Sequence, residues 1–84
     1  MNAVERATEL AMMPMKNLPE LALGYAKYLC GKFGMCGETF ITAYAHYAQC
    51  VEGLPCDDDL YRADAMAAAW FSDVGADAPA IVGN

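Results

Sequence analysis

The stretch NLPELALGYAKYLCGKFG, residues 17–34, carries the clearest helix pattern in the chain. It opens with signals of a helix start, because Asn17 is a good N-cap, Pro19 suits the first turn and Glu20 stands three residues after the cap. Gly34 is a natural residue to follow a helix end. We therefore predict a helix between Asn17 and Gly34. Its apolar face recurs at helical spacing and comprises Leu18, Leu21, Ala22, Tyr25, Leu29 and Phe33.

Three further helices are predicted on either side of this stretch. The first must stop at Pro14, because proline cannot continue a helix. The third ends at Gly53 and the fourth at Gly75. The fourth opens in the run Asp57-Asp58-Asp59, where one aspartate can cap and the others favour the positive helix N-terminus. The expected ranges are residues 3–13, 38–52 and 57–74.

The third and fourth helices each show one apolar stripe at a period of three to four residues. The stripe of the third helix comprises Phe40, Ile41, Tyr44, Tyr47, Ala48 and Val51. The stripe of the fourth comprises Leu60, Ala63, Ala67, Trp70, Phe71 and Val74. On the third helix the polar residues are predicted to face solvent, and they are Thr39, Thr42, His46 and Gln49.

Composition and connection lengths predict an all-α fold in one domain. Apolar residues make up 57% of the chain and are rich in Ala and Met, which favour helix over sheet. Short connections make neighbouring helices antiparallel. We expect a small bundle of three main antiparallel helices plus a short N-terminal helix over residues 1–75, and a disordered, flexible tail over residues 76–84. The predicted core comprises Tyr25, Leu29, Phe33, Phe40, Tyr44, Tyr47, Leu60, Trp70 and Phe71.

The charge of the chain excludes some function classes. The net charge is −6, with five basic and eleven acidic residues. The few basic residues are scattered, which disfavours direct binding of nucleic acid. The longest apolar stretch, residues 21–35, is interrupted by lysines and glycines and does not predict a membrane span. Residues 1–10 show no uninterrupted apolar run of a signal peptide. We expect a soluble protein of the cytoplasm.

Four cysteines form two pairs with the same spacing, Cys30 with Cys36 and Cys50 with Cys56, each across a predicted turn. In a reducing compartment we favour free thiols that pack as small apolar groups at helix ends. A disulfide across one or both turns is the alternative. A zinc site is the least favoured interpretation, because the spacing does not match a zinc knuckle and the pairs lie at opposite ends of the third helix.

Catalytic or metal-binding chemistry is not indicated. His46 is the single histidine, and its helical neighbours supply neither a nucleophile nor an orienting carboxylate. The run Asp57-Asp58-Asp59 lacks the alternating spacing of a calcium loop. No glycine-rich phosphate loop is present in the sequence. We therefore expect a non-enzymatic protein without cofactor or metal.

Two groups of residues are candidates for contact with a protein partner. The first is an acidic patch that suits a partner with a basic surface. It comprises Glu52, Asp57, Asp58, Asp59 and Asp64. The second is a methionine cluster, because methionine-rich surfaces adapt to varied partners and to self-association. It comprises Met12, Met13 and Met15.

These features favour a small acidic helical protein-binding module. In general character the chain resembles accessory inhibitors that phages and mobile elements encode, such as anti-CRISPR and other anti-defence proteins, which implies occlusion of a partner's basic surface. A structural homo-oligomer or homodimer joined through the methionine surface is one alternative. The other is a small-ligand binder, with a pocket lined by Tyr25, Tyr28, Tyr44 and Tyr47.

Overall fold

The computed structural model describes residues 1–75 and confirms the predicted all-α fold as a small helical bundle. Helical turns make up every regular element of residues 1–75, and no strand occurs among them. The expected tail, residues 76–84, lies outside the described part. The elements in chain order are α1 (Ala3–Ala11), η1 (Met15–Asn17), α2 (Glu20–Phe33), α3 (Gly37–Cys50), η2 (Asp59–Tyr61), α4 (Ala65–Trp70) and η3 (Phe71–Gly75).

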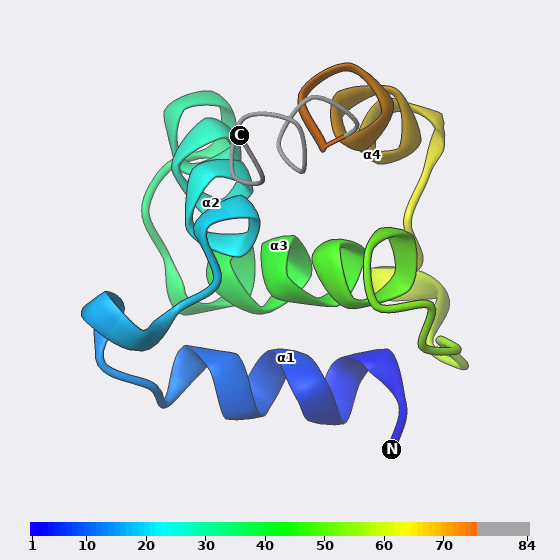
Figure 1. The fold of residues 1–84 in the computed structure, drawn as a ribbon, viewed down its shortest axis with the longest axis horizontal. Helices are drawn as coiled ribbons and strands as arrows, with labels where there is room; N and C mark the ends of the chain where they lie inside the picture. The colour runs from blue at the N-terminus through cyan, green and yellow to red at the C-terminus, as the bar shows by residue number, and fades with distance from the viewer. Residues whose placement is uncertain (76–84) are drawn as a thin grey trace, which may run out of the picture.

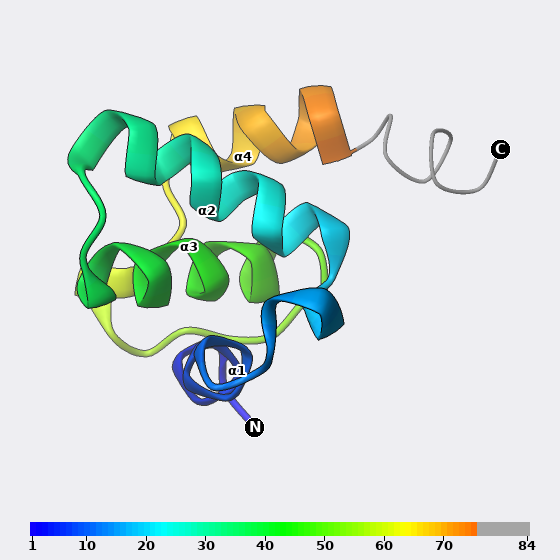
Figure 2. The same cartoon turned by 90° about the vertical axis from the view of Figure 1, so that its left-hand side faces the viewer.

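Helix α3 lies in the middle of the arrangement. Helix α1 packs along one side of it, and α2 and α4 lie side by side on the other (Figures 1 and 2). The contacts of α3 with α1 and α2 are the most extensive between helices. Helix α1 is therefore one of the main packing partners of α3. Helix α4 has only 6 residues and contacts α3 less. Because neighbours cover α3 on both sides, most of its circumference must be buried.

The core joins both layers through α3. Its aromatic part gathers around Tyr25, whose ring centroid lies 4.7 Å from that of Phe71 and 5.1 Å from that of Trp70. Small side chains contribute much of the buried surface of α1 and α3, and small side chains allow helix axes to approach closely. The fully buried residues of these two helices are Ala3, Ala7 and Leu10 in α1 and Ala43, Ala45 and Ala48 in α3.

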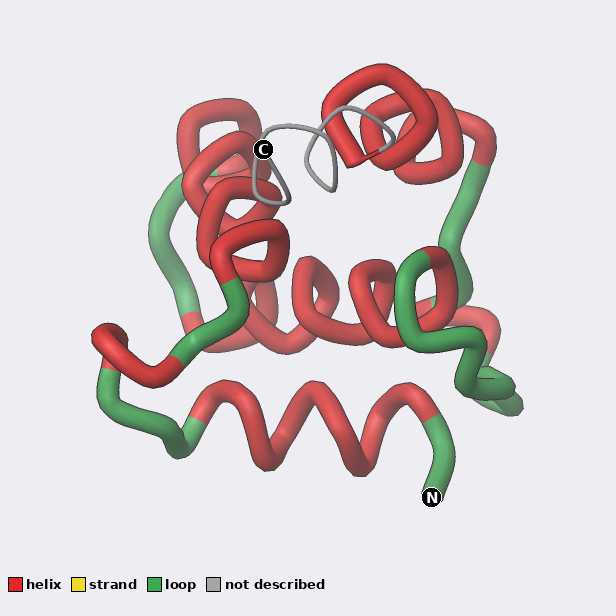
Figure 3. Tube along the Cα trace, in the orientation of Figure 1, coloured by secondary structure: helices red, strands yellow, loops and turns green. Residues whose placement is uncertain are grey.

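Two helix starts differ from the prediction. Residue Pro19, and not Asn17, occupies the N-cap position of α2, because residues 15–17 form the separate turn η1. The fourth helix begins after Asp64, whose carboxylate accepts a hydrogen bond from the backbone N–H of Ala67 at 2.9 Å. Residues 57–64 form a loop with the short turn η2, as Figure 3 shows between α3 and α4. The predicted helix of residues 57–74 was therefore too long.

The side chain of Gln49 explains why residues 61–63 do not join α4. Its amide donates to the Tyr61 carbonyl at 2.8 Å and accepts from the Ala63 N–H at 3.0 Å. These two bonds satisfy backbone groups that a helix would otherwise pair, and they hold the segment against α3. The prediction that Gln49 faces solvent was wrong for this reason.

Several predicted burials are also corrected. His46 and Thr39 were expected on a solvent face but are 5% and 9% exposed, because α3 is covered on both sides. Phe33 and Leu60 were expected in the core but are 64% and 63% exposed. Phe33 is the last residue of α2, beyond the packed part of the helix, and Leu60 lies in η2. Two further stripe residues, Val51 and Val74, are exposed as well.

The end of α2 offers a matched pair of glycine substitutions. Gly31 lies inside the helix with open space around a Cβ, so Gly31→Ala should raise the unfolding free energy by about 0.5–1 kcal/mol. Gly34 follows the helix at φ 91° and ψ 161°, a region nearly closed to other residues, so Gly34→Ala should lower it by roughly 1–3 kcal/mol. Urea denaturation measures both changes. A shift in the same direction for both variants would contradict the assigned helix end.

Candidate functional site

The acidic patch is only partly available as free negative charge. Asp57, Asp58 and Asp59 are exposed and lie beside Asn2 and Val4, at the start of α1. The carboxylate of Asp58 accepts a hydrogen bond from the Leu60 N–H at 3.0 Å and caps η2. Asp59 forms an exposed ion pair of 2.9 Å with Arg62. Asp64 is occupied as the cap of α4.

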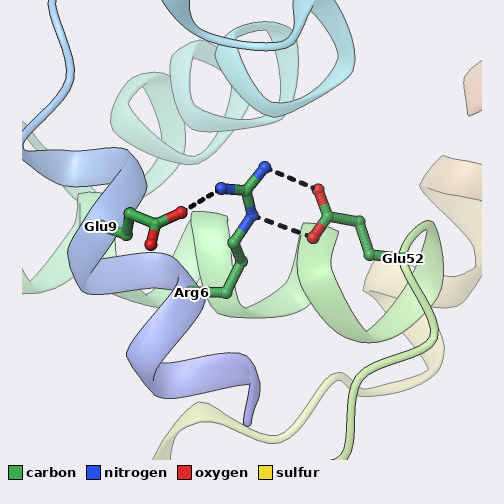
Figure 4. A network of polar contacts seen from close by, with 3 residues as sticks. All are labelled: Arg6, Glu9 and Glu52. Atoms are coloured by element: carbon green, nitrogen blue, oxygen red, sulfur yellow. Dashed lines mark hydrogen bonds and ion pairs between the residues drawn. The ribbon is translucent and has the colours of Figure 1, made fainter. Parts of the chain in front are cut away.

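Glu52 is paired and does not extend the free patch. Its carboxylate receives two hydrogen bonds from the Arg6 guanidinium, from Nε at 2.9 Å and from a terminal nitrogen at 3.1 Å (Figure 4). Arg6 also pairs with Glu9. The side chains of Arg6 and Glu52 are only 20% and 25% exposed, and Glu52, ahead of Glu9, raises the pKa of Arg6. This pair ties α1 to the turn that follows α3.

The methionine cluster is largely exposed. Met12 and Met15 are 82% and 66% exposed, whereas Met13 is half-buried against the core. The structure adds Met35, which is 80% exposed and lies between α2 and α3. The sequence pattern missed Met35 because it stands in a turn, where no helical period assigns a face. Met13, Met15 and Met35 belong to one region of the surface, and Met12 precedes Met13 in the chain.

This region contains two adjoining apolar hollows, which we call the methionine groove. It lies where the end of α1, η1, α2 and the start of α3 meet, and Figure 2 shows the backbone of these elements. The hollows have volumes of about 490 and 350 Å³ and share the walls formed by Met15, Phe40 and Tyr44. The first is completed by Leu10, Ala11, Met13, Leu18, Gly37 and Ile41. The second is completed by Leu23, Ala26, Lys27, Cys30, Gly31 and Met35.

A third, more polar hollow of about 500 Å³ lies on the other side of α3. His46 lines this hollow, but its Nδ1 forms a hydrogen bond of 2.8 Å with the hydroxyl of the core residue Tyr25. Burial lowers the pKa of His46, and Asp64 and the Arg62 backbone partly oppose this shift. A neutral ring with its proton on Nε2 fits this arrangement, with the Tyr25 hydroxyl as donor to Nδ1. The histidine therefore has a packing role.

The tyrosines proposed as the lining of a ligand pocket are mostly core residues. Tyr25, Tyr44 and Tyr47 are at most 7% exposed. Burial raises the pKa of all three hydroxyls. Tyr44 alone among these three contributes to the walls of the methionine groove. The arrangement favours a structural role for this set.

The four cysteines are free thiols. Cys30 and Cys56 are half-buried, which suits the predicted packing role, but Cys36 and Cys50 are exposed. Cys36 occupies the N-cap position of α3, and a hydrogen bond with the Thr39 hydroxyl, at 3.0 Å, lowers its pKa. Within residues 1–75 no three His, Cys, Asp or Glu side chains converge as metal ligands would.

In the described part of the chain, no helix combines the length and apolar character that a bilayer crossing requires. Comparison with protein-family models, with curated proteins and with solved structures gives no match. Functional inference therefore depends on the surfaces described above.

Proposed function

We propose that this chain is a non-enzymatic protein-binding module whose main contact surface is the methionine groove. The observation that carries the proposal is the exposure of Met15 and Met35 in the walls of two adjoining apolar hollows. Contiguous exposed apolar surface on a small domain is typical of a partner-binding site. Methionine side chains also adjust to the shape of an incoming surface because they are unbranched and flexible.

Within this class, an accessory or inhibitory role fits the small size and the lack of a catalytic constellation in residues 1–75. Such a protein acts in the cytoplasm by covering a surface that its partner needs, as the resemblance to phage-encoded anti-defence inhibitors implies. The acidic residues Asp57, Asp58 and Asp59 provide a second candidate surface, for a partner with a basic face. Their exposure supports this role, but the pairing of Asp59 and Glu52 leaves less free charge than the composition suggests.

Affinity capture from the native host, with three forms of the protein compared in parallel, tests the main proposal. Met15→Glu places a charge in the wall shared by both hollows, and Asp57→Lys reverses a charge on the acidic patch. Both side chains are exposed, so both variants should keep the circular dichroism and thermal transition of the parent. We expect a partner that the parent and Asp57→Lys retain and Met15→Glu loses.

Loss of the captured partner with Asp57→Lys alone would show that the acidic patch, and not the methionine groove, is the main contact surface. Sedimentation of the purified chain at micromolar concentration separates partner binding from self-association. A dimer that dissociates on Met15→Glu would favour the homo-oligomer alternative.

A further inference from the structure

The shape of the methionine groove restricts what can occupy it. Its two hollows adjoin through the shared side chains Met15, Phe40 and Tyr44. Two neighbouring apolar hollows match large side chains three or four positions apart on one face of a helix, which stand about 5–6 Å from each other. An amphipathic helix that lays its apolar face in a groove is a common mode of peptide recognition.

The charges around the groove are unlike those of the rest of the molecule. The chain has a net charge of −6, yet no carboxylate lines either hollow. Lys27 is the one charged residue in their walls. Lys16 stands next to Met15 in η1. Both lysines are exposed, and neither forms an ion pair within residues 1–75.

Most of the free acidic residues lie away from this groove. The exception is Glu20, which begins α2 about one turn before Leu23, a wall residue of the second hollow. Asp57, Asp58 and Asp59 adjoin the first residues of α1, whereas Leu10 and Ala11, at its end, line the groove. A helix of this length is about 13 Å long, which exceeds the screening length of physiological salt, about 8 Å. Two lysines, Lys16 and Lys27, therefore outnumber the one carboxylate, Glu20, that stands beside the groove.

We infer that the methionine groove binds an amphipathic helical segment of a partner protein whose apolar face is flanked by acidic residues. The inference rests on the proposed protein-binding function and adds the chemistry of the partner. Apolar side chains of the segment occupy the two hollows, and its carboxylates lie beside Lys16 and Lys27. A segment flanked by Lys or Arg meets like charge there and is rejected.

Two stapled helical peptides of about four turns test the inference. They share leucines on one face and differ only in their flanking residues, which are Glu in one and Lys in the other. Fluorescence anisotropy measures binding to the full chain, and methyl NMR locates it. Met13, Met15 and Met35 should shift on addition of the acidic peptide. Met1 and Met66 line neither hollow and serve as internal references.

We expect the acidic peptide to bind about tenfold more tightly than the basic one at low salt, from two exposed charge contacts. Lys27→Glu should reduce or reverse this preference, and Met15→Glu should abolish binding of both peptides. Equal binding of the two peptides, or a preference for the basic one, would overturn the inferred partner chemistry while leaving the groove as a binding site.

Unperturbed groove methionines with both peptides would overturn the helical occupant itself. The proposed function has its own test in the dependence of partner capture on Met15, so the two failures are distinguishable. Self-association that protects Met15 and Met35 in the free protein would assign the groove to a second copy of the chain.

Discussion

Replacing Tyr25 by alanine is expected to lower the unfolding free energy by roughly 3–5 kcal/mol, the range typical of large aromatic residues truncated in a core. Tyr25 is fully buried, and its ring contacts Trp70 and Phe71 from the layer of α4 as well as His46 from α3. A domain of this length has a total stability of roughly 4–13 kcal/mol. The substitution therefore removes a large share of the stability, as far-ultraviolet circular dichroism in a urea titration would measure.

Tyr28 provides the matched control for this substitution. It lies one helical turn later on α2, with its ring 5.9 Å from that of Tyr25, but it is only half-buried. Tyr28→Ala makes the same chemical change in the same helix, so any difference reflects packing and not helix propensity. We expect it to cost clearly less than Tyr25→Ala. Equal losses for the two variants would show that Tyr25 is not the centre of the core.

Local signals were sufficient to place α1, α2 and α3 along the chain. The apolar period of residues 18–33 located α2, and the breakers Pro14 and Gly53 marked real boundaries near α1 and α3. Short-range patterns of this kind report the preference of a segment for helix and for one buried face. Such patterns are reliable where tertiary contacts favour the same helix and bury the same face.

The misplaced residues share a non-local cause. His46 and Thr39 are buried because α3 is covered on both sides. The apolar period of a single helix does not indicate how many other helices pack against it. The start of α4 moved from Asp57 to Asp64 because Gln49, more than ten positions earlier, binds the backbone of residues 61–63. Several aspartates were equally good caps in the sequence, and this distant contact selected among them.

The candidate site was predictable only in part for the same reason. The exposed Met12 and Met15 were identified from an AMMPM stretch that a short helix cannot bury. The groove itself needs Phe40 and Tyr44 from α3 and Lys27 from α2, which only the folded chain brings together. The reduced charge of the acidic patch is likewise a folded-state property, because Arg6 and Glu52 are 46 positions apart.

The second large effect is a loss of stability on mild acidification that depends on His46. Burial lowers the pKa of His46 in the folded protein, so the unfolded chain binds a proton more readily, near its ordinary pKa of 6.5. The contribution of His46 to stability is then fully present above pH 6.5 and is lost as the pH falls toward the folded-state pKa. Within that window the unfolding free energy should fall by at most about 1.4 kcal/mol per pH unit, the limit for one proton.

Measurements between pH 5 and 7 isolate this group, because it is the single histidine and ordinary carboxyl groups titrate lower. His46→Gln keeps a hydrogen-bonding side chain opposite Tyr25 but cannot titrate, so its unfolding free energy should be nearly flat over this range. The proton resonances of the His46 ring in the parent protein give the folded pKa directly, which keeps the test decisive if the variant folds poorly. A ring that titrates at or above 6.5 would mean that burial does not set its pKa, and the predicted loss of stability on mild acidification would be wrong.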